Sequence, residues 1–115
     1  MSAAALLATE AAGVCPFGGP TKSVDHGIVS QAILMAPGWC VTLFHFAAGQ
    51  KLSEHTTLAR ALVQELPGSC DFSLNGETRR LNTGELLDIP PKLAHAVRAT
   101  TDLALLTTQG TPSKA

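Results

Sequence analysis

From residue 27 onward the chain is a series of short apolar runs broken by turn-forming residues. The runs are GIVSQAILMA, WCVTLFHF, RALVQEL, DFSL, TRRL, ELLDI, HAVRA and LALLTT. Each has the length of a β-strand, and dipeptides such as Pro37-Gly38, Pro67-Gly68 and Pro90-Pro91 lie between them. No window between residues 27 and 109 keeps a period near 3.6. The pattern therefore predicts an all-β body.

The segment DFSLNGETRRL predicts a β-hairpin. Asn75 and Gly76 both tolerate the positive φ angles that a two-residue type I′ turn requires. Phe72 and Leu74 alternate with polar residues on the incoming strand. We therefore expect the two strands to pair directly across Asn75-Gly76.

The spacing of these elements predicts one domain. A chain of 115 residues suits a single core, and about eight strands at intervals of roughly 8 to 12 residues favour a sandwich or barrel. We expect an N-terminal segment over 1–26 that is irregular or helical, a barrel over 27–109, and a flexible tail over 110–115.

Low charge suggests that part of the surface is covered by a partner. Charged residues form 15% of the chain, against about 25% in an ordinary soluble domain, and several strands are apolar on both faces. The simplest partner is a second copy, so we expect a homodimer. The net charge is −1 and the only basic pair is Arg79-Arg80, which argues against nucleic acid or an anionic membrane as partner.

Cysteine usage and the N-terminus favour a cytoplasmic protein. Cys15, Cys40 and Cys70 are odd in number and form no CxxC pair, which is typical of a reducing compartment. The Ala-rich start lacks the basic region of a signal peptide, and no apolar run approaches the roughly 18 to 20 residues of a membrane span.

Two glycine, proline and histidine spacings carry a family resemblance. They are Gly49, five residues, His55 and then Gly68; and Gly84, five residues, Pro90, four residues and His95. The chain resembles the cupin family over residues 27 to 109. The resemblance implies a double-stranded β-helix, or jelly-roll, barrel whose two motifs are separated by a hairpin.

The resemblance also implies a metal site, here with half of its ligands. In the family, two histidines and a glutamate of the first motif and one histidine of the second bind a divalent metal. His55 and His95 stand at the first and last of these positions, whereas Thr57 and Ala61 replace the other two. His55 and His95 are thus candidate ligands for Fe, Mn, Zn or Ni, and a metal-free cavity is the alternative.

Other positions depart from the family pattern. Lys92 stands at a motif glycine and Ala99 at a motif asparagine, so we expect the turn before His95 to differ in detail. The stretches SEHTTLARALVQELPG and IPPKLAHAVRA, with the tail LALLTT, are similar to a subfamily of small uncharacterised cupins whose first motif has a single histidine.

Glu65 is a candidate for completing the site. In a regular strand, period two places residues 61, 63 and 65 on one face, which in the family is the barrel interior. We therefore expect Glu65, Ala61 and Val63 to line the cavity, together with Thr57. If instead the strand ends or bulges near Pro67, Glu65 lies at the solvated rim.

Two further residues are weighed as ligands. Glu54 is adjacent to His55, so in a strand its side chain points to the opposite face. His45 lies between Phe44 and Phe46 and is expected on the face opposite to them, as a third ligand or as a surface or interface histidine.

Two functions from different classes fit these residues. In the first, a homodimeric cupin binds a small organic molecule, with or without a weakly held divalent metal. In the second, the protein is a small-molecule enzyme of dioxygenase, isomerase or decarboxylase type, in which the metal acts as a Lewis acid or oxygen-binding centre. Neither sequence motif identifies the ligand.

Overall fold

The structure is a computed structural model that describes residues 5–7, 10–15 and 27–110. Its strands are β1 (Ile28–Ala36), β2 (Trp39–Phe46), β3 (Lys51–His55), β4 (Arg60–Glu65), β5 (Ser69–Leu74), β6 (Glu77–Asn82), β7 (Leu86–Ile89), β8 (His95–Ala99) and β9 (Leu103–Gly110). The all-β prediction is confirmed. No helix within the described part of the chain has the length and hydropathy that a membrane span requires.

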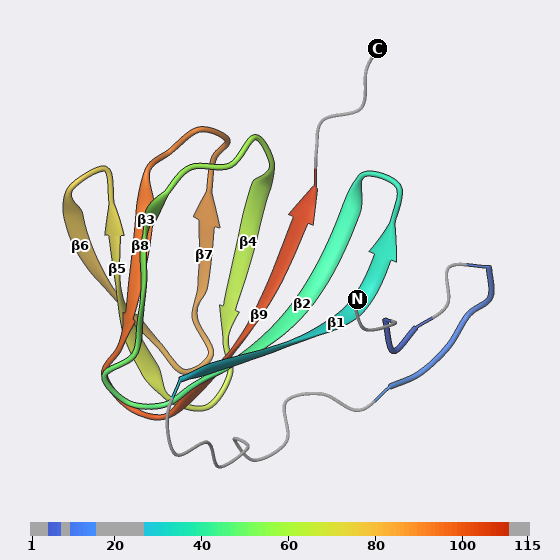
Figure 1. Ribbon diagram of the computed structural model, residues 1–115, viewed down its shortest axis with the longest axis horizontal. Helices are drawn as coiled ribbons and strands as arrows, with labels where there is room; N and C mark the ends of the chain where they lie inside the picture. The colour runs from blue at the N-terminus through green and yellow to red at the C-terminus, as the bar shows by residue number, and fades with distance from the viewer. Residues whose placement is uncertain (1–4, 8–9, 16–26, 111–115) are drawn as a thin grey trace.

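The strands form two antiparallel sheets that face each other as a barrel (Figure 1). The five-stranded sheet has the order β1-β2-β9-β4-β7, and the four-stranded sheet has the order β3-β8-β5-β6. The chain passes from one sheet to the other at most of its connections. Only β1 and β2, and β5 and β6, are successive strands of the same sheet. The interior is packed by alternate apolar side chains of both sheets, including Phe46, Val63, Phe72 and Leu103.

The β5–β6 hairpin has the geometry that its sequence predicts. Leu74 pairs with Glu77, so the loop contains only Asn75 and Gly76, and their φ angles are 50° and 87°. Both values lie in the left-handed region that the type I′ turn requires. The hairpin places Phe72 opposite Val97 of β8 inside the barrel.

The described N-terminal residues cover the outer face of the five-stranded sheet. The N–H groups of Leu6 and Leu7 donate to the carbonyl oxygens of Ala32 and Ile33, at 3.2 and 2.8 Å. Leu7 and Cys15 pack against a second apolar cluster on that face, formed by Ile33, Leu43, Ala104 and Leu106. Leu7 and Cys15 therefore cover part of this face from within the same chain.

Residues 5–7 and 10–15 are irregular, which is one of the two forms expected for the N-terminal segment. Of the tail expected at 110–115, Gly110 is the last residue of β9, and residues 16–26 and 111–115 lie outside the described part. The strand Lys51–His55 was missed because four of its five residues are exposed, which leaves almost no apolar alternation to detect.

Candidate functional site

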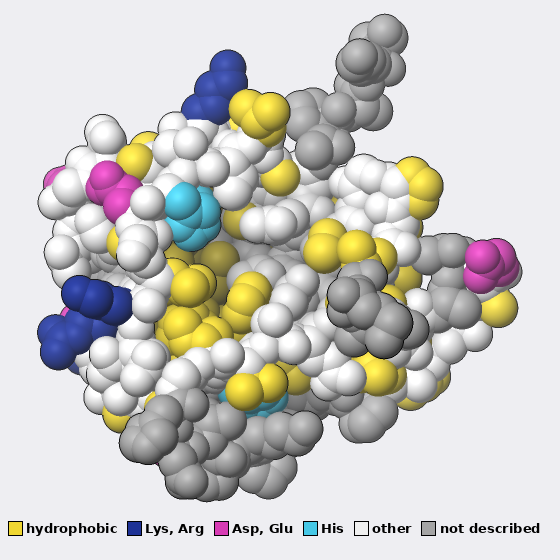
Figure 2. All heavy atoms as spheres, in the orientation of Figure 1, with side chains coloured by type: hydrophobic (Ala, Val, Ile, Leu, Met, Phe, Trp, Pro, Cys, Tyr) yellow, Lys and Arg dark blue, Asp and Glu magenta, His cyan; other side chains and the backbone are white. Residues whose placement is uncertain are grey.

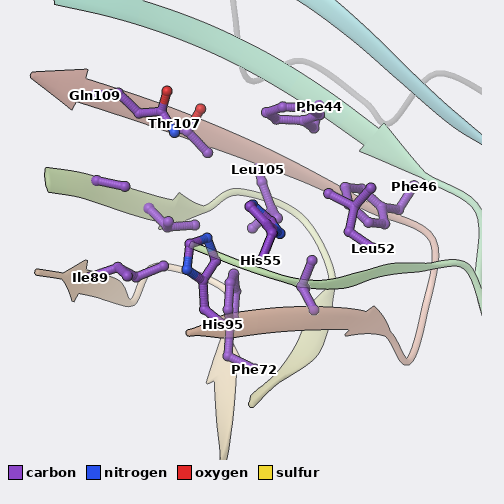
Figure 3. A pocket seen from close by; sticks show the side chains of 13 residues that line it. Phe44, Phe46, Leu52, His55, Phe72, Ile89, His95, Leu105, Thr107 and Gln109 are labelled. Carbon is purple, nitrogen blue, oxygen red and sulfur yellow. The ribbon is translucent and has the colours of Figure 1, made fainter. Parts of the chain in front are cut away.

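A cavity of about 80 Å³ lies between the two sheets. Its walls are mainly apolar and include three phenylalanine rings, Phe44, Phe46 and Phe72, and its polar lining residues are His55, His95, Thr107 and Gln109 (Figure 3). Figure 2 shows a hollow in this face of the molecule, with hydrophobic side chains inside it and a histidine at its rim. An apolar pocket with a few convergent polar groups is the usual form of a small-molecule site.

His55 and His95 lie side by side at the polar end of this cavity. His55 ends β3, His95 begins β8, and the two residues are direct partners in the antiparallel register. Their ring centroids are 4.2 Å apart and the ring planes are inclined by 58°. His55 is exposed, whereas His95 is only 7% exposed, so the pair extends from the solvent into the barrel.

Each imidazole ring is held by a backbone carbonyl group two residues earlier in the chain. The Nδ1 atom of His55 lies 2.9 Å from the carbonyl oxygen of Ser53, and that of His95 lies 2.9 Å from the carbonyl oxygen of Leu93. A carbonyl oxygen only accepts, so each Nδ1 must carry the proton and donate it. In a neutral ring the Nε2 atom is then a bare acceptor, in the form that a metal ion or a hydrogen-bond donor needs.

The turn before His95 keeps the backbone conformation that a glycine would have there. Lys92 has a φ of 68°, in the left-handed region, and its N–H donates to the carbonyl oxygen of Thr57 at 2.8 Å. Lys92 thus takes a left-handed conformation that glycine adopts more readily. Lys92 adopts the strained conformation at a cost of about 1 to 2 kcal/mol, which the surrounding contacts offset.

The two first-motif positions that lack a metal-binding side chain, Ala61 and Thr57, lie in different surroundings. Ala61 and Val63 line the cavity, as their shared face of β4 predicts. Thr57 is not among the lining residues, because β3 ends at His55 and the strand alternation stops there. The Thr57 hydroxyl instead donates to the carbonyl oxygen of Ala59 at 2.9 Å.

Glu65 points inward but lies too deep to join the histidines. It is 1% exposed and shares the inner face of β4 with Ala61 and Val63, yet it is not among the residues that line the cavity. Neither carboxylate oxygen has a hydrogen-bond partner among the described residues. Glu65 therefore neither completes a metal shell with His55 and His95 nor lies at a solvated rim.

Burial dominates the chemistry around Glu65. Desolvation raises the pKa of its carboxyl from 4.5 to about 7, and the nearby Cys70 thiol opposes this rise only in part. Burial, followed by the charge of Glu65, also raises the pKa of the Cys70 thiol far above its ordinary value. Cys70 is fully buried and therefore stays a protonated, unreactive thiol at neutral pH.

The other two candidate ligands lie away from the cavity. Glu54 is exposed beside the inward-facing His55, as strand alternation predicts. His45 is buried on the opposite face of β2 from Phe44 and Phe46, which line the cavity. Neither Glu54 nor His45 completes a site with the two histidines.

Thr107 and Gln109 are polar lining residues that the sequence analysis missed. Both belong to β9, where Leu103, Leu105, Thr107 and Gln109 occupy alternate positions. This alternation, with polarity increasing toward one end of the strand, was a detectable signal that the polar end of the cavity includes β9.

The donor set fits a metal ion only in part. Two Nε2 atoms are available, but the described residues contain no group of three or more His, Cys, Asp or Glu side chains able to hold an ion. Catalytic zinc sites usually have three protein ligands, and non-haem iron sites use two histidines and a carboxylate. Here water or a bound ligand would have to supply every further position.

Comparison with known proteins supports the fold. A scan of protein-family models found no match, and a search of curated proteins found none. Among solved structures, a conserved protein of unknown function from Streptococcus pyogenes is 20% identical with a TM-score of 0.82, over 97% of this chain and 98% of its own. A cupin superfamily protein from Desulfitobacterium hafniense is 20% identical with a TM-score of 0.80, over 93% and 96%.

An enzyme has the same fold in part of its chain. Salicylate 1,2-dioxygenase from Pseudoaminobacter salicylatoxidans is 19% identical to this chain with a TM-score of 0.70, over 81% of this chain and 28% of its own.

The two-sheet barrel defines the class of double-stranded β-helix proteins. Within that class, the chain has the fold of the cupin superfamily.

Proposed function

We propose that this protein is a small cupin that binds a small organic molecule in its barrel cavity. The observation that carries the proposal is the contact between His55 and His95 at the polar end of an apolar cavity. Both rings are oriented by backbone carbonyl groups before any ligand arrives, so little ordering of these side chains is required on binding.

A divalent metal, where present, would be held weakly by the Nε2 atoms of His55 and His95. Such an ion would supply Lewis acidity to a ligand oxygen. The backbone carbonyl groups of Ser53 and Leu93 keep the two imidazole rings in orientation. The wall lined by phenylalanine side chains excludes water from the deeper part of the cavity. Because imidazole must be neutral to ligate, metal affinity would fall as the pH is lowered through histidine protonation.

The alternative is a metal-dependent enzyme of dioxygenase, isomerase or decarboxylase type. The fold shared with a dioxygenase is compatible with it. It has less support than ligand binding, because no third protein ligand accompanies the two histidines in the described part of the chain.

Metal analysis of protein purified without a histidine tag tests the choice. We expect substoichiometric metal that brief chelation removes, and almost none in His55→Ala or His95→Ala. Glu54→Ala is the matched control, because this exposed neighbour of His55 is not among the cavity-lining residues. A stoichiometric ion that survives chelation and is lost in either histidine variant would favour the enzyme over the binding protein.

We also propose that the protein forms a homodimer in the cytoplasm and binds neither nucleic acid nor membranes. Leu62 and Leu86 support the dimer, since they are 40% and 60% exposed on the outer faces of the paired strands β4 and β7. They are diagonal neighbours there, because Gln64 pairs with Leu86. The three cysteines are free thiols, which is compatible with a reducing compartment.

Sedimentation analysis tests the dimer. The wild type is expected to sediment as a dimer, whereas Leu62→Glu and Leu86→Glu should shift it toward monomer because each places a charge in the interface. Leu58→Glu is the control, since Leu58 is 73% exposed in the loop between β3 and β4. A strictly monomeric wild type at high concentration contradicts the proposal.

A further inference from the structure

The lining of the cavity indicates a neutral ligand. No Asp, Glu, Lys or Arg side chain is among the described residues that line it, and its polar groups are two imidazole rings, one hydroxyl and one amide. A charged ligand would lose its hydration without gaining a counter-charge, which is costly in an apolar site. The volume of about 80 Å³ suits a compound with a single ring whose edge reaches the open mouth of the cavity.

The histidines determine which polar group the ligand carries. Each Nδ1–H is already donated to a backbone carbonyl oxygen, so the neutral rings of His55 and His95 offer two adjacent Nε2 acceptors. A ligand that covers these acceptors removes them from water, so an acceptor left without a donor in the complex would be unfavourable. The complementary ligand group is therefore a hydrogen-bond donor.

The walls favour an aromatic body. Phe44, Phe46 and Phe72 approach from both sheets, and the rings of Phe44 and Phe46 are 6.2 Å apart at an inclination of 59°. Aromatic groups gain from such edge-to-face and offset contacts beyond the area that they bury. The phenylalanine side chains and the two acceptors belong to the same cavity (Figure 3).

We propose that the cavity binds a small neutral aromatic alcohol, of which phenol is the simplest, through a hydroxyl that donates to Nε2 of His55 or His95. The aromatic ring packs against the three phenylalanines. This assignment rests on the proposed ligand-binding function and adds the chemical class of the ligand. Thr107, whose hydroxyl donates to the carbonyl oxygen of Thr42 at 3.4 Å, and Gln109 border the same polar end.

The geometry disfavours other single-ring ligands. A carboxylate such as benzoate needs donors, which the bare Nε2 atoms of the two neutral rings do not offer. A benzylammonium ion donates but finds no carboxylate in the cavity lining. Toluene and anisole fill the apolar part and leave both Nε2 acceptors without a donor.

Calorimetric titration of chelator-treated protein with four probes tests the assignment. Phenol is expected to bind about tenfold more tightly than anisole, the size of one net hydrogen bond, and more tightly than toluene or benzoate. His55→Phe keeps an aromatic ring and removes one acceptor, so it should reduce the ratio of phenol to anisole affinity, and His95→Phe should do the same. Glu54→Gln should leave that ratio unchanged.

The outcomes separate this inference from the function on which it rests. If anisole, toluene or benzoate binds as tightly as phenol, or if the histidine variants keep the phenol preference, the ligand class is wrong and ligand binding stands. If none of the four probes binds the wild type, the proposed function fails with it. Because His55 is exposed, the His55→Phe variant gives a result even if His95→Phe does not fold.

Discussion

Replacing Glu65 with glutamine is expected to stabilise the protein by up to about 3 kcal/mol near pH 8 and to change its stability little near pH 4.5. The carboxyl is 1% exposed and burial raises its pKa from 4.5 to about 7, at about 1.4 kcal/mol per pKa unit. The folded state therefore binds this proton more tightly than the unfolded state does. The free energy of unfolding that this bound proton contributes is fully present below pH 4.5 and is lost as the pH rises to about 7.

The measurement is urea unfolding of wild type and Glu65→Gln at intervals from pH 4.5 to 8.5. Glutamine is similar in size to the protonated acid and does not titrate, so the difference between the two proteins isolates Glu65 from other titrating groups. Glu54→Gln, an exposed carboxyl on β3, is the control and should shift stability by no more than about 0.5 kcal/mol. A difference that is constant with pH would show that Glu65 titrates normally.

Gly68→Ala is expected to destabilise the protein by about 3 to 5 kcal/mol. Gly68 has a φ of 107°, and an added Cβ would lie 2.5 Å from the carbonyl oxygen of Asp102 and 2.6 Å from Cβ of Leu103. Backbone strain and overpacking each cost about 1 to 3 kcal/mol. The turn cannot easily move aside, since the Gly68 N–H donates to the Thr83 hydroxyl, which in turn donates to the Gly68 carbonyl oxygen.

Gly49→Ala is the matched control for this substitution. Gly49 also has a positive φ, of 85°, but an added Cβ would meet no atom within 4 Å. It should lose only the conformational part, about 1 to 2 kcal/mol. Equal losses of unfolding free energy in the two variants would mean that the close approach of Gly68 to Asp102 and Leu103 does not contribute.

Much of the fold could be predicted because the local signals agree. Strand-length apolar runs, the Asn75-Gly76 turn and the two motif spacings all indicate one antiparallel barrel. Strand β3 was the exception, since its exposed residues carry no period. The packing of Leu7 and Cys15 on the outer face of the five-stranded sheet could not be predicted, because it depends on contacts between residues that are far apart in the sequence.

The sequence predicted which face of its strand a candidate residue occupies, but not how deep inside the barrel its side chain lies. Period two correctly indicates that Glu65 faces inward, but it cannot show that the side chain lies near Cys70, deeper than the histidine pair. It fails at Thr57, where the strand has already ended. The Nδ1 contacts of His55 and His95 to their own backbones also required coordinates, and they determine which ring atom is available.

Methyl-resolved NMR during a phenol titration tests the central claim, ligand binding inside the barrel beside His55 and His95, most directly. The methyl signals of Val63, Ile89 and Leu105, which line the cavity, are expected to shift. Those of Ile33 and Leu106, in the cluster on the outer face of the five-stranded sheet, should stay in place. Shifts confined to Ile33 and Leu106, or no shifts at saturating phenol, would contradict the account.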